Sequence, residues 1–143
     1  LGLAPDTARR YLAYFADAYL VHLVPRHGTL NERLTSPSKL YSCDLGITHL
    51  FVGDRDWGAY FENYVYLLLR QYQDVFYLRQ GTTEIDFLTQ DGTLIEAKFH
   101  DEMRGAQREL FDSTKANRKW ELSSVRDLSI IEATWGSGST DRS

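Results

Sequence analysis

The sequence is poor in sulfur: its 143 residues include one cysteine, Cys43, and one methionine, Met103. A single cysteine excludes an internal disulfide and a cysteine-based zinc site, and it suits a reducing cytoplasm. We therefore expect a cytoplasmic protein in which Cys43 is a small core residue. Because the chain begins with leucine and has its only methionine at position 103, we also expect a fragment or a processed product of a longer protein.

Three further absences limit the function. No apolar run approaches the ~20 residues that a membrane-spanning helix needs, and no signal peptide is visible, so we expect a soluble domain without a membrane partner. The chain contains no GxxxxGK[ST] sequence, so it lacks a Walker A phosphate cradle and is not expected to hydrolyse ATP itself. The formal net charge of -4 argues against a generally basic surface for nucleic acid.

What the chain does contain is enough apolar material for a core, with 43% hydrophobic and 13% aromatic residues. At this length we expect one compact domain preceded by a smaller segment. Within residues 1–53 the pattern predicts a helix over about 5–18, a strand over 19–24 and a second strand over 39–43. This order is that of the second half of a winged-helix module, so residues 1–53 are expected to be a partial winged-helix-like segment and linker.

Residues 54–135 are expected to form an α/β core, a small mixed sheet of about four strands flanked by helices. Asp54 to Asp56 offers an N-cap for the first helix. The predicted elements are a helix over 57–72, a strand over 75–79, a hairpin over 84–99, a helix over 104–119 and a strand over 128–134. The last strand is expected beside the strand of Glu96, parallel to it, through a right-handed crossover. The small, polar residues 136–143 are expected to be a disordered tail.

The predicted hairpin is the most informative stretch, because Glu84-Ile85-Asp86-Phe87 is followed closely by Ile95-Glu96-Ala97-Lys98. Side chains alternate between the two faces of a strand, so the apolar residues of each strand share one face and the charged residues share the other. Ile85 and Phe87 are therefore expected to face the core together.

The loop between these strands decides which charges meet. Gln90-Asp91-Gly92 reads as a three-residue loop, a type I turn whose glycine adopts the left-handed conformation. That register sets Asp86 opposite Glu96, and Glu84 opposite Lys98. A two-residue Asp-Gly turn would slip the pairing by one residue and mix the charged and buried sets, so hydrophobic matching disfavours it.

Two carboxylates and an ammonium on one hairpin suit metal-assisted cleavage of phosphodiester bonds. Hard cations such as Mg²⁺ or Mn²⁺ bind carboxylate oxygens, polarise a phosphoryl oxygen and lower the pKa of a bound water. Asp86 and Glu96 are the expected ligands, and Lys98 is their electrostatic partner. The alternative is that Glu84, Asp86 and Lys98 form ordinary cross-strand ion pairs on a solvated face.

Together with a helix that carries Glu62, these residues resemble the signature of the PD-(D/E)XK nuclease superfamily, including its Holliday-junction resolvase-like branch. More specifically, the chain resembles the C-terminal domain of unknown function carried by many prokaryotic AAA-family ATPases. The motifs that carry this resemblance are Lys39-Leu40-Tyr41, Asp44-Leu45-Gly46, Phe61-Glu62-Asn63-Tyr64-Val65 and the two hairpin strands. The resemblance runs from about the first residue to Phe99. Ile85 stands where the superfamily usually has proline.

The resemblance implies a restriction-endonuclease-like core, a metal-dependent DNA endonuclease activity and an AAA-family ATPase domain upstream in the same parent chain. It implies that Glu62 is a third catalytic and metal-binding carboxylate, where the residues alone also allow a first-turn glutamate favoured by the helix dipole. Gln107 would take the place of a glutamine that some members use near the metal; a solvated helix residue is the alternative. Because branch-specific cleavage by resolvase-like members usually depends on a dimer, a homo-oligomer is a further hypothesis.

Basic residues are candidates for phosphate contact. The predicted helix over 104–119 carries a basic group, Arg104, Arg108, Lys115, Arg118 and Lys119. The pair Arg9-Arg10 would face DNA in a complete winged helix. A solvated helix face is the alternative for both groups.

Three functions from different classes therefore stay open. The first is a metal-dependent DNA endonuclease domain. The second is a DNA- or partner-binding module that keeps the fold without turnover. The third is a regulatory or assembly domain for an attached ATPase.

Overall fold

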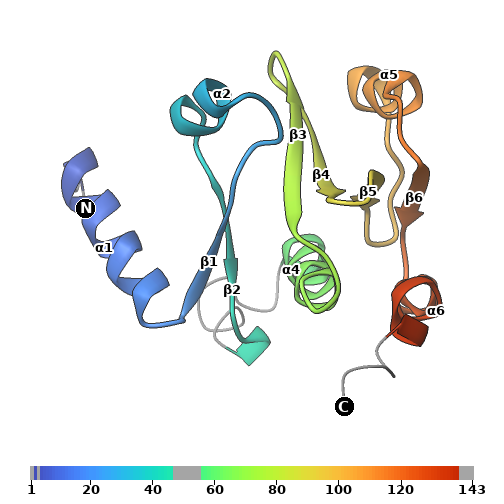
Figure 1. The fold of residues 1–143 in the computed structure, drawn as a ribbon, viewed down its shortest axis with the longest axis horizontal. Helices are drawn as coiled ribbons and strands as arrows, with labels where there is room; N and C mark the ends of the chain where they lie inside the picture. Colours follow the sequence, from blue (N-terminus) through green and yellow to red (C-terminus); the bar gives the residue numbers. More distant parts are fainter. Residues whose placement is uncertain (1, 3, 47–55, 139–143) are drawn as a thin grey trace.

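The computed structural model describes residue 2 and residues 4–46 and 56–138. This part of the chain forms two sheets flanked by helices, so the fold is α/β as the sequence predicts (Figure 1). In chain order the elements are α1 Pro5–Asp17, β1 Val21–Val24, α2 Leu30–Thr35, β2 Lys39–Ser42, α4 Trp57–Leu69, β3 Val75–Gln80, β4 Thr83–Thr89, β5 Thr93–Ala97, α5 Gly105–Ser113, β6 Arg118–Leu122 and α6 Ser129–Trp135.

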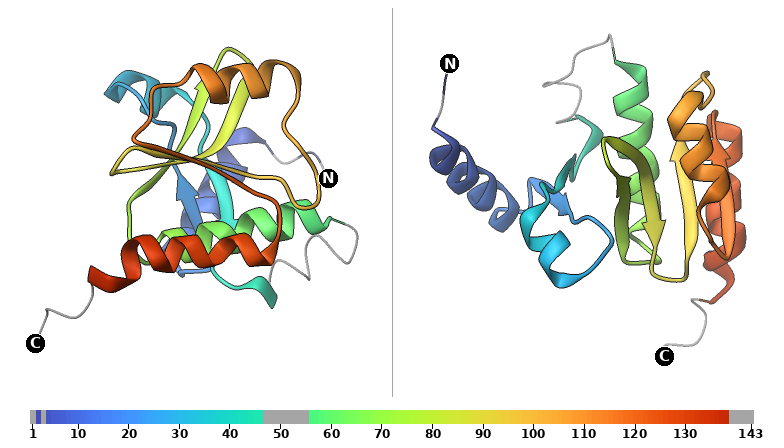
Figure 2. Two further views of the ribbon diagram at one scale, coloured as in Figure 1. Left: turned by 90° about the vertical axis from the view of Figure 1, so that its right-hand side faces the viewer. Right: turned by 90° about the horizontal axis from the view of Figure 1, so that it is seen from above.

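The larger sheet has the strand order β3-β4-β5-β6, with its first two pairs antiparallel and β5-β6 parallel. Helices α4 and α6 cover one face, and α5 covers the other (Figure 2). One core cluster lies on the α4 side and includes Val65, Phe87 and Ile95. A second lies under α5 and includes Leu94 and Leu110. The strands that carry the candidate site are therefore buried between two layers of helix.

The strand beside β5 lies where the sequence predicts it but is built from other residues. β6 runs parallel to β5 and sets Glu121 opposite Glu96. Trp120 and Leu122 alternate with charged residues along β6 and pack against the core, which is the pattern of a half-buried strand. The prediction of one long helix over 104–119 is therefore wrong beyond the end of α5.

The predicted strand over 128–134 is instead mostly the helix α6. The apolar residues Ile130 and Ile131 favour a strand, but a capped 3-10 turn over Val125–Leu128 directly precedes them and continues into α6. The Asp127 carboxylate accepts hydrogen bonds from the backbone N–H groups of Ser123 and Ser124, both at 2.8 Å. This capping satisfies N–H groups that the start of a helical segment leaves unpaired. Local capping here outweighs the strand propensity of Ile130 and Ile131.

A β-bulge interrupts β4 at Asp86, one of the predicted metal ligands. The register of β3 against β4 shifts, so that Asp86 and Phe87 both lie opposite Tyr77. Bulges bend a strand, re-aim its side chains and are frequent next to active sites. The hairpin itself has the predicted register, because Phe87 pairs with Ile95 and Gly92 has a φ of +83°.

The bulge makes one prediction wrong. Ile85 and Phe87 do not share a face, because Ile85 packs in the cluster under α5 and Phe87 packs in the cluster under α4. One extra residue shifts the alternation by one, so residues on the two sides of the bulge exchange faces. Asp86 lies at this exchange, which turns its side chain toward α4 and β2.

β1 and β2 form a separate antiparallel pair that packs on the core. Val24 and Tyr41 belong to the same core cluster as α4. The helix and two strands predicted within residues 1–53 are confirmed, and α2 between the strands is an addition. Its signal is the capping box of Thr29 and Glu32. The division at residue 53 into a winged-helix-like segment and a nuclease-like core stays a prediction.

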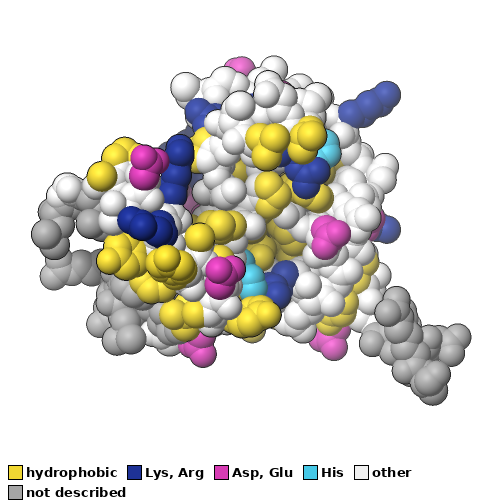
Figure 3. All heavy atoms as spheres, turned by 60° about the vertical axis from the view of Figure 1, so that its left-hand side comes forward, with side chains coloured by type: hydrophobic (Ala, Val, Ile, Leu, Met, Phe, Trp, Pro, Cys, Tyr) yellow, Lys and Arg dark blue, Asp and Glu magenta, His cyan; other side chains and the backbone are white. Residues whose placement is uncertain are grey.

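α1 projects from the rest of the molecule and has no buried residue. Tyr11, Tyr14 and Phe15 are exposed on it, as are Leu23 and Leu40 on the neighbouring strands. Figure 3 brings this side forward and shows hydrophobic side chains spread over it. Of the helices that the structure describes, none combines the length and the apolar character needed to cross a membrane.

Two predictions concern chain ends and loops. Asp56 is confirmed as the N-cap of α4, because its carboxylate accepts from the Ala59 N–H at 2.9 Å. Asp54, the other residue proposed for this cap, lies outside the described residues. Gly136–Gly138, at the start of the predicted tail, forms a 3-10 turn. The rest of that tail also lies outside the described residues.

Candidate functional site

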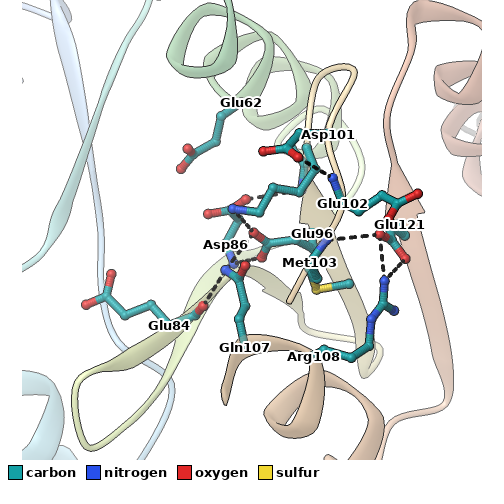
Figure 4. Close-up of polar contacts among 12 residues, drawn as sticks. Glu62, Glu84, Asp86, Glu96, Asp101, Glu102, Met103, Gln107, Arg108 and Glu121 are labelled. Carbon is teal, nitrogen blue, oxygen red and sulfur yellow. Dashed lines mark hydrogen bonds and ion pairs between the residues drawn. The ribbon is translucent and has the colours of Figure 1, made fainter. Parts of the chain in front are cut away.

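Three carboxylates singled out in the sequence come from three different elements. Asp86 lies on β4, Glu96 on β5 and Glu62 on α4. Figure 4 shows the side chains of Asp86 and Glu96 next to each other and Glu62 pointing toward them. Asp86 is 7% exposed and Glu96 is 0% exposed, so neither belongs to a solvated charged face. A buried carboxylate is costly unless partners satisfy it.

The carboxylates of Asp86 and Glu96 accept hydrogen bonds from backbone N–H groups of the neighbouring strand. Glu96 Oε2 accepts from the Asp86 N–H at 3.0 Å, and Asp86 Oδ2 accepts from the Ala97 N–H at 3.1 Å. The regular pairing of β4 with β5 starts one step further along, at Phe87 and Ile95. The two carboxylates therefore join the strands at the place where the bulge opens the ladder.

The other carboxylate oxygen of Glu96, Oε1, contacts two side chains. Lys98 Nζ is 3.1 Å from Glu96 Oε1, and Gln107 Nε2 donates to the same oxygen at 2.8 Å. Gln107 also donates to the backbone carbonyl of Glu84 at 3.0 Å, which ties α5 to both strands. Lys98 and Gln107 therefore lie beside a predicted ligand, as the sequence analysis expects.

The electrostatics of Glu96 are unusual for a strand residue. Burial and the nearby charge of Asp86 raise the pKa of Glu96 to about 8, although Lys98 opposes this. Burial alone would lower the pKa of Lys98, but the charge of Glu96 outweighs it and raises that pKa. The Glu96 carboxyl therefore holds its proton more tightly than an exposed glutamate does, and shifts of this kind are enriched at functional sites.

Two side chains that were not predicted as site residues complete the cluster. Lys39 Nζ lies 3.1 Å from Glu62 Oε1 and 2.9 Å from Asp86 Oδ1. The Tyr41 hydroxyl donates to Glu62 Oε1 at 2.6 Å. Because they stand two residues apart on β2, Lys39 and Tyr41 share one face of the strand. That alternation is the sequence signal that points to them, but it does not say which element the face meets.

These contacts shift the pKa values of Glu62, Lys39 and Tyr41. Burial and repulsion by Asp86 raise the pKa of Glu62. Burial alone would lower the pKa of Lys39, but the charges of Asp86 and Glu62 outweigh it and raise that pKa. Burial and the charge of Glu62 raise the pKa of Tyr41, so its hydroxyl stays a neutral donor. Lys39 is therefore a permanent positive charge between two carboxylates.

The donor set matches a hard divalent cation, although the three carboxylates do not meet at one point. Among the residues that the structure describes, no group of three or more His, Cys, Asp or Glu is placed to hold a metal ion. Between Glu62 and Asp86 stands the Lys39 ammonium instead. Carboxylate oxygens are the ligands that Mg²⁺ and Mn²⁺ prefer. In the described part of the chain, the only cation between the Glu62 and Asp86 carboxylates is the Lys39 ammonium.

Glu84 lies apart from the cluster. Its carboxylate points away in Figure 4 and is 3.9 Å from Arg79 on β3. Lys98, which was predicted opposite Glu84, pairs with Glu96 instead. Glu84 therefore contributes through its backbone carbonyl, which accepts from Gln107.

The basic residues proposed for phosphate contact are not gathered on one helix. α5 ends at Ser113, so Lys115, Arg118 and Lys119 lie beyond it. The Arg118 guanidinium is 2.9 Å from the Asp91 carboxylate in the hairpin turn. The prediction of a single basic helix is therefore wrong, because the chain turns after Ser113 and continues as a strand.

The other basic candidates differ in how free they are. Arg108 makes two hydrogen bonds to Glu121, at 2.8 and 2.9 Å, so it is already paired. Arg104 lies 3.8 Å from the Asp101 carboxylate, and its side chain is 80% exposed. Arg9-Arg10 lies on α1, which Figures 1 and 2 place on the opposite side of the β1-β2 pair from β4 and β5. A role for these residues in binding DNA stays a prediction.

Known proteins add little to this geometry. No family model and no solved structure matches the chain. One curated relative, "Uncharacterized protein MJ1544" of Methanocaldococcus jannaschii, is 30% identical over 128 residues. The match covers 85% of this chain and 29% of that protein, so the chain spans less than a third of the relative's length. The function therefore has to be inferred from the site.

Proposed function

We propose that this chain is a PD-(D/E)XK nuclease-like domain that hydrolyses phosphodiester bonds of DNA with Mg²⁺ or Mn²⁺. The observation that carries the proposal is that Asp86 and Glu96, both buried, are joined at the open end of a bulged hairpin, with Lys98 3.1 Å from Glu96. Carboxylates and a lysine fixed on rigid strands are what metal-assisted phosphodiester cleavage requires. Ordinary surface ion pairs need neither the bulge nor the burial.

The residues divide the work as follows. Asp86, Glu96 and Glu62 would hold the cation, and the cation would supply polarisation of a phosphoryl oxygen and activation of a water. Lys98 stabilises negative charge that develops on the phosphate. Gln107 orients Glu96 through its 2.8 Å hydrogen bond. Because burial and Asp86 raise the pKa of Glu96 to about 8, a bound cation would favour the ionised form of Glu96.

The motif series that resembles the C-terminal domains of prokaryotic AAA-family ATPases extends the proposal to partners. DNA is the proposed substrate, and an upstream ATPase domain of the same parent chain is the proposed neighbour. A cytoplasmic location and a homo-oligomer belong to the same proposal. This part rests on sequence motifs rather than on the geometry of the cluster.

A second function has one observation in its favour. The alternative is a non-catalytic DNA- or partner-binding or regulatory domain of that ATPase, and the net charge of -4 favours its partner-binding or regulatory form over any domain that binds DNA. In that case the carboxylates and lysines would be structural ion pairs. This alternative requires that the wild type cleaves no DNA in the presence of metal.

The test is a pair of variants on one strand. Asp86→Asn removes a proposed ligand, and Glu84→Gln changes a carboxylate on β4 that points away from the cluster. With Mn²⁺ and plasmid, single-stranded or branched DNA, Asp86→Asn should reduce the cleavage rate by about 10³-fold, because several kcal/mol of transition-state stabilisation are lost. Glu84→Gln should stay within a few-fold of wild type. Absence of metal-dependent cleavage by the wild type on all three substrates would overturn the proposal.

A further inference from the structure

Lys39 is placed unusually for a lysine of an ion pair. Its ammonium joins carboxylates from two different elements, Asp86 on β4 at 2.9 Å and Glu62 on α4 at 3.1 Å. The side chains of these three residues are 20%, 11% and 26% exposed, in the order lysine, aspartate, glutamate. The lysine itself comes from β2, which belongs to the other sheet. The positive charge that lies between the two carboxylates thus comes from a strand of the smaller sheet.

The ammonium and a divalent cation cannot use these oxygens at the same time. Glu62 Oε1 and Asp86 Oδ1, through which the two carboxylates could share a Mg²⁺ or Mn²⁺ ion, already accept from Lys39, and two neighbouring cations repel each other strongly in a site shielded from water. Binding of the metal therefore requires that Lys39 moves away. Glu62 would keep one partner, because Tyr41 donates to it independently at 2.6 Å.

Lys39 has an aromatic neighbour besides the two carboxylates. Its Nζ already lies 5.9 Å from the centre of the Tyr77 ring, within the distance at which an aromatic face attracts a cation. The acidic groups around Lys39 are Glu62, Asp86 and Glu96, and Lys98 is the second basic group of the cluster. Removing Lys39 would leave three carboxylates against one ammonium.

We infer that Lys39 is a resident counter-ion that occupies the cation position between Glu62 and Asp86 and must be displaced before a divalent metal binds there. The inference rests on the proposed metal-dependent function and deepens it. Lys39 thereby weakens metal binding in the resting protein and stabilises the fold when no metal is present. It is a positioning residue, since its effect reaches the reaction through the two carboxylates.

The test measures metal binding without DNA. Mn²⁺ is titrated into the whole chain by calorimetry, in wild type, in Lys39→Met and in Lys119→Met. Lys119 is a matched control, because it loses the same charge on β6, where its Nζ contacts the backbone oxygen of Asp112. Lys39→Met should bind Mn²⁺ at least tenfold more tightly than wild type, and Lys119→Met should match the wild type. Mn²⁺ should also raise the unfolding temperature of Lys39→Met more than that of wild type.

The outcomes separate this inference from the proposed function. If wild type binds Mn²⁺ and folded Lys39→Met binds it equally or less tightly, the counter-ion role is wrong while the metal site survives. If neither protein binds Mn²⁺, both proposals fail. If Lys39→Met does not fold, wild-type crystals grown with Mn²⁺ decide the matter. The inference requires Mn²⁺ bound by Glu62 and Asp86 with the Lys39 side chain moved, and Mn²⁺ elsewhere with Lys39 in place overturns it.

Discussion

The two ends of the β4-β5 hairpin each place a carboxylate among close polar partners, but the pKa values of the two carboxylates shift in opposite directions. At the turn, Asp91 accepts hydrogen bonds from the side chains of Thr89, Thr93, Arg118 and Trp135. Burial would raise the pKa of Asp91, but these donors outweigh it and lower the pKa to about 2. At the open end, burial and a second carboxylate raise the pKa of Glu96 to about 8.

The difference lies in the neighbours of each carboxylate. The turn surrounds Asp91 with donors, so its charge stabilises the fold. The open end collects Asp86, Glu96 and Glu62, whose mutual repulsion is compensated in part by two lysines. A protein that kept only stable contacts would not retain such a cluster, and sites that work against stability are characteristic of function. The contrast separates a carboxylate stabilised by donors from one that burial and a like charge destabilise, within a single hairpin.

Of the substitutions considered, Glu96→Gln should have the largest effect, which is a change in how the free energy of unfolding depends on pH. In metal-free wild type, Glu96 keeps its proton in the folded state up to about pH 8, while its ordinary value is 4.5. Its contribution to stability is therefore fully present below pH 4.5 and is lost as the pH rises to about 8, on the order of 1 kcal/mol per pH unit. Urea unfolding at pH 5 to 8 with a chelator should show a falling free energy of unfolding in wild type. Glu96→Gln should remove most of that slope, and an unchanged slope would contradict the assignment.

Asp91→Asn tests the opposite end. At pH 7 the variant should lower the free energy of unfolding by about 1–3 kcal/mol, because charged hydrogen bonds are weakened. The contribution of Asp91 is fully present above its ordinary value of 3.8 and is lost as the pH falls to about 2. Chemical unfolding between pH 4 and 2 should therefore show a drop in wild type that is smaller in Asp91→Asn.

The control for this experiment is Asp112→Asn, which changes an exposed carboxylate on α5. It should keep the acid dependence of wild type. Any DNA cleavage per folded molecule should be equal in wild type and Asp91→Asn, because Asp91 does not contact the carboxylate cluster. A loss of cleavage in folded Asp91→Asn would contradict the division of the hairpin into two ends.

Gly92→Ala gives the smallest effect and refines the description of the turn. Gly92 has a φ of +83° and Gly81 a φ of +62°, so alanine is strained at both, by about 1 kcal/mol. A Cβ at Gly92 would also lie 2.8 Å from Asn117 Nδ2, whereas nothing lies within 4 Å of one at Gly81. Asn117 donates to the Asp91 carbonyl, so Gly92→Ala should cost about 1 kcal/mol more than Gly81→Ala. Equal losses in thermal unfolding would show that Asn117 yields freely.

The parts of the fold that depend on local chemistry could be predicted from the sequence. The turn of the hairpin, its register and the N-cap at Asp56 follow from residue types a few positions apart. The pairing of Asp86 with Glu96 follows from alternation along the strands, whereas the place of Gln107 beside Glu96 came from a resemblance. The proximity of Glu62 came from a resemblance, and its contact with Lys39 joins residues that are 23 positions apart. Nothing local in the sequence encodes such a distance.

The misses have physical causes of the same kind. Ile85-Asp86-Phe87-Leu88 contains no glycine or proline, so the bulge leaves no mark in the sequence and appears only when β3 is paired. The exchange of strand and helix after α5 arose because Ile130 and Ile131 have strong strand propensity, whereas the cap at Ser124 and Asp127 decides for a helix. Lys39 was placed correctly on a strand, but the sequence does not show that this strand packs against the hairpin.

The short contact between the two sheets has a consequence for the solubility of the chain. β3 is the outer strand of the larger sheet, and its backbone at Tyr77 is already engaged by Pro25 and His27, at 3.2 and 2.8 Å. An open strand of this kind would otherwise offer its amides and carbonyls to another molecule, which is a route to aggregation. By pairing with the middle of β3, the segment after β1 blocks this edge of the sheet from pairing with another molecule.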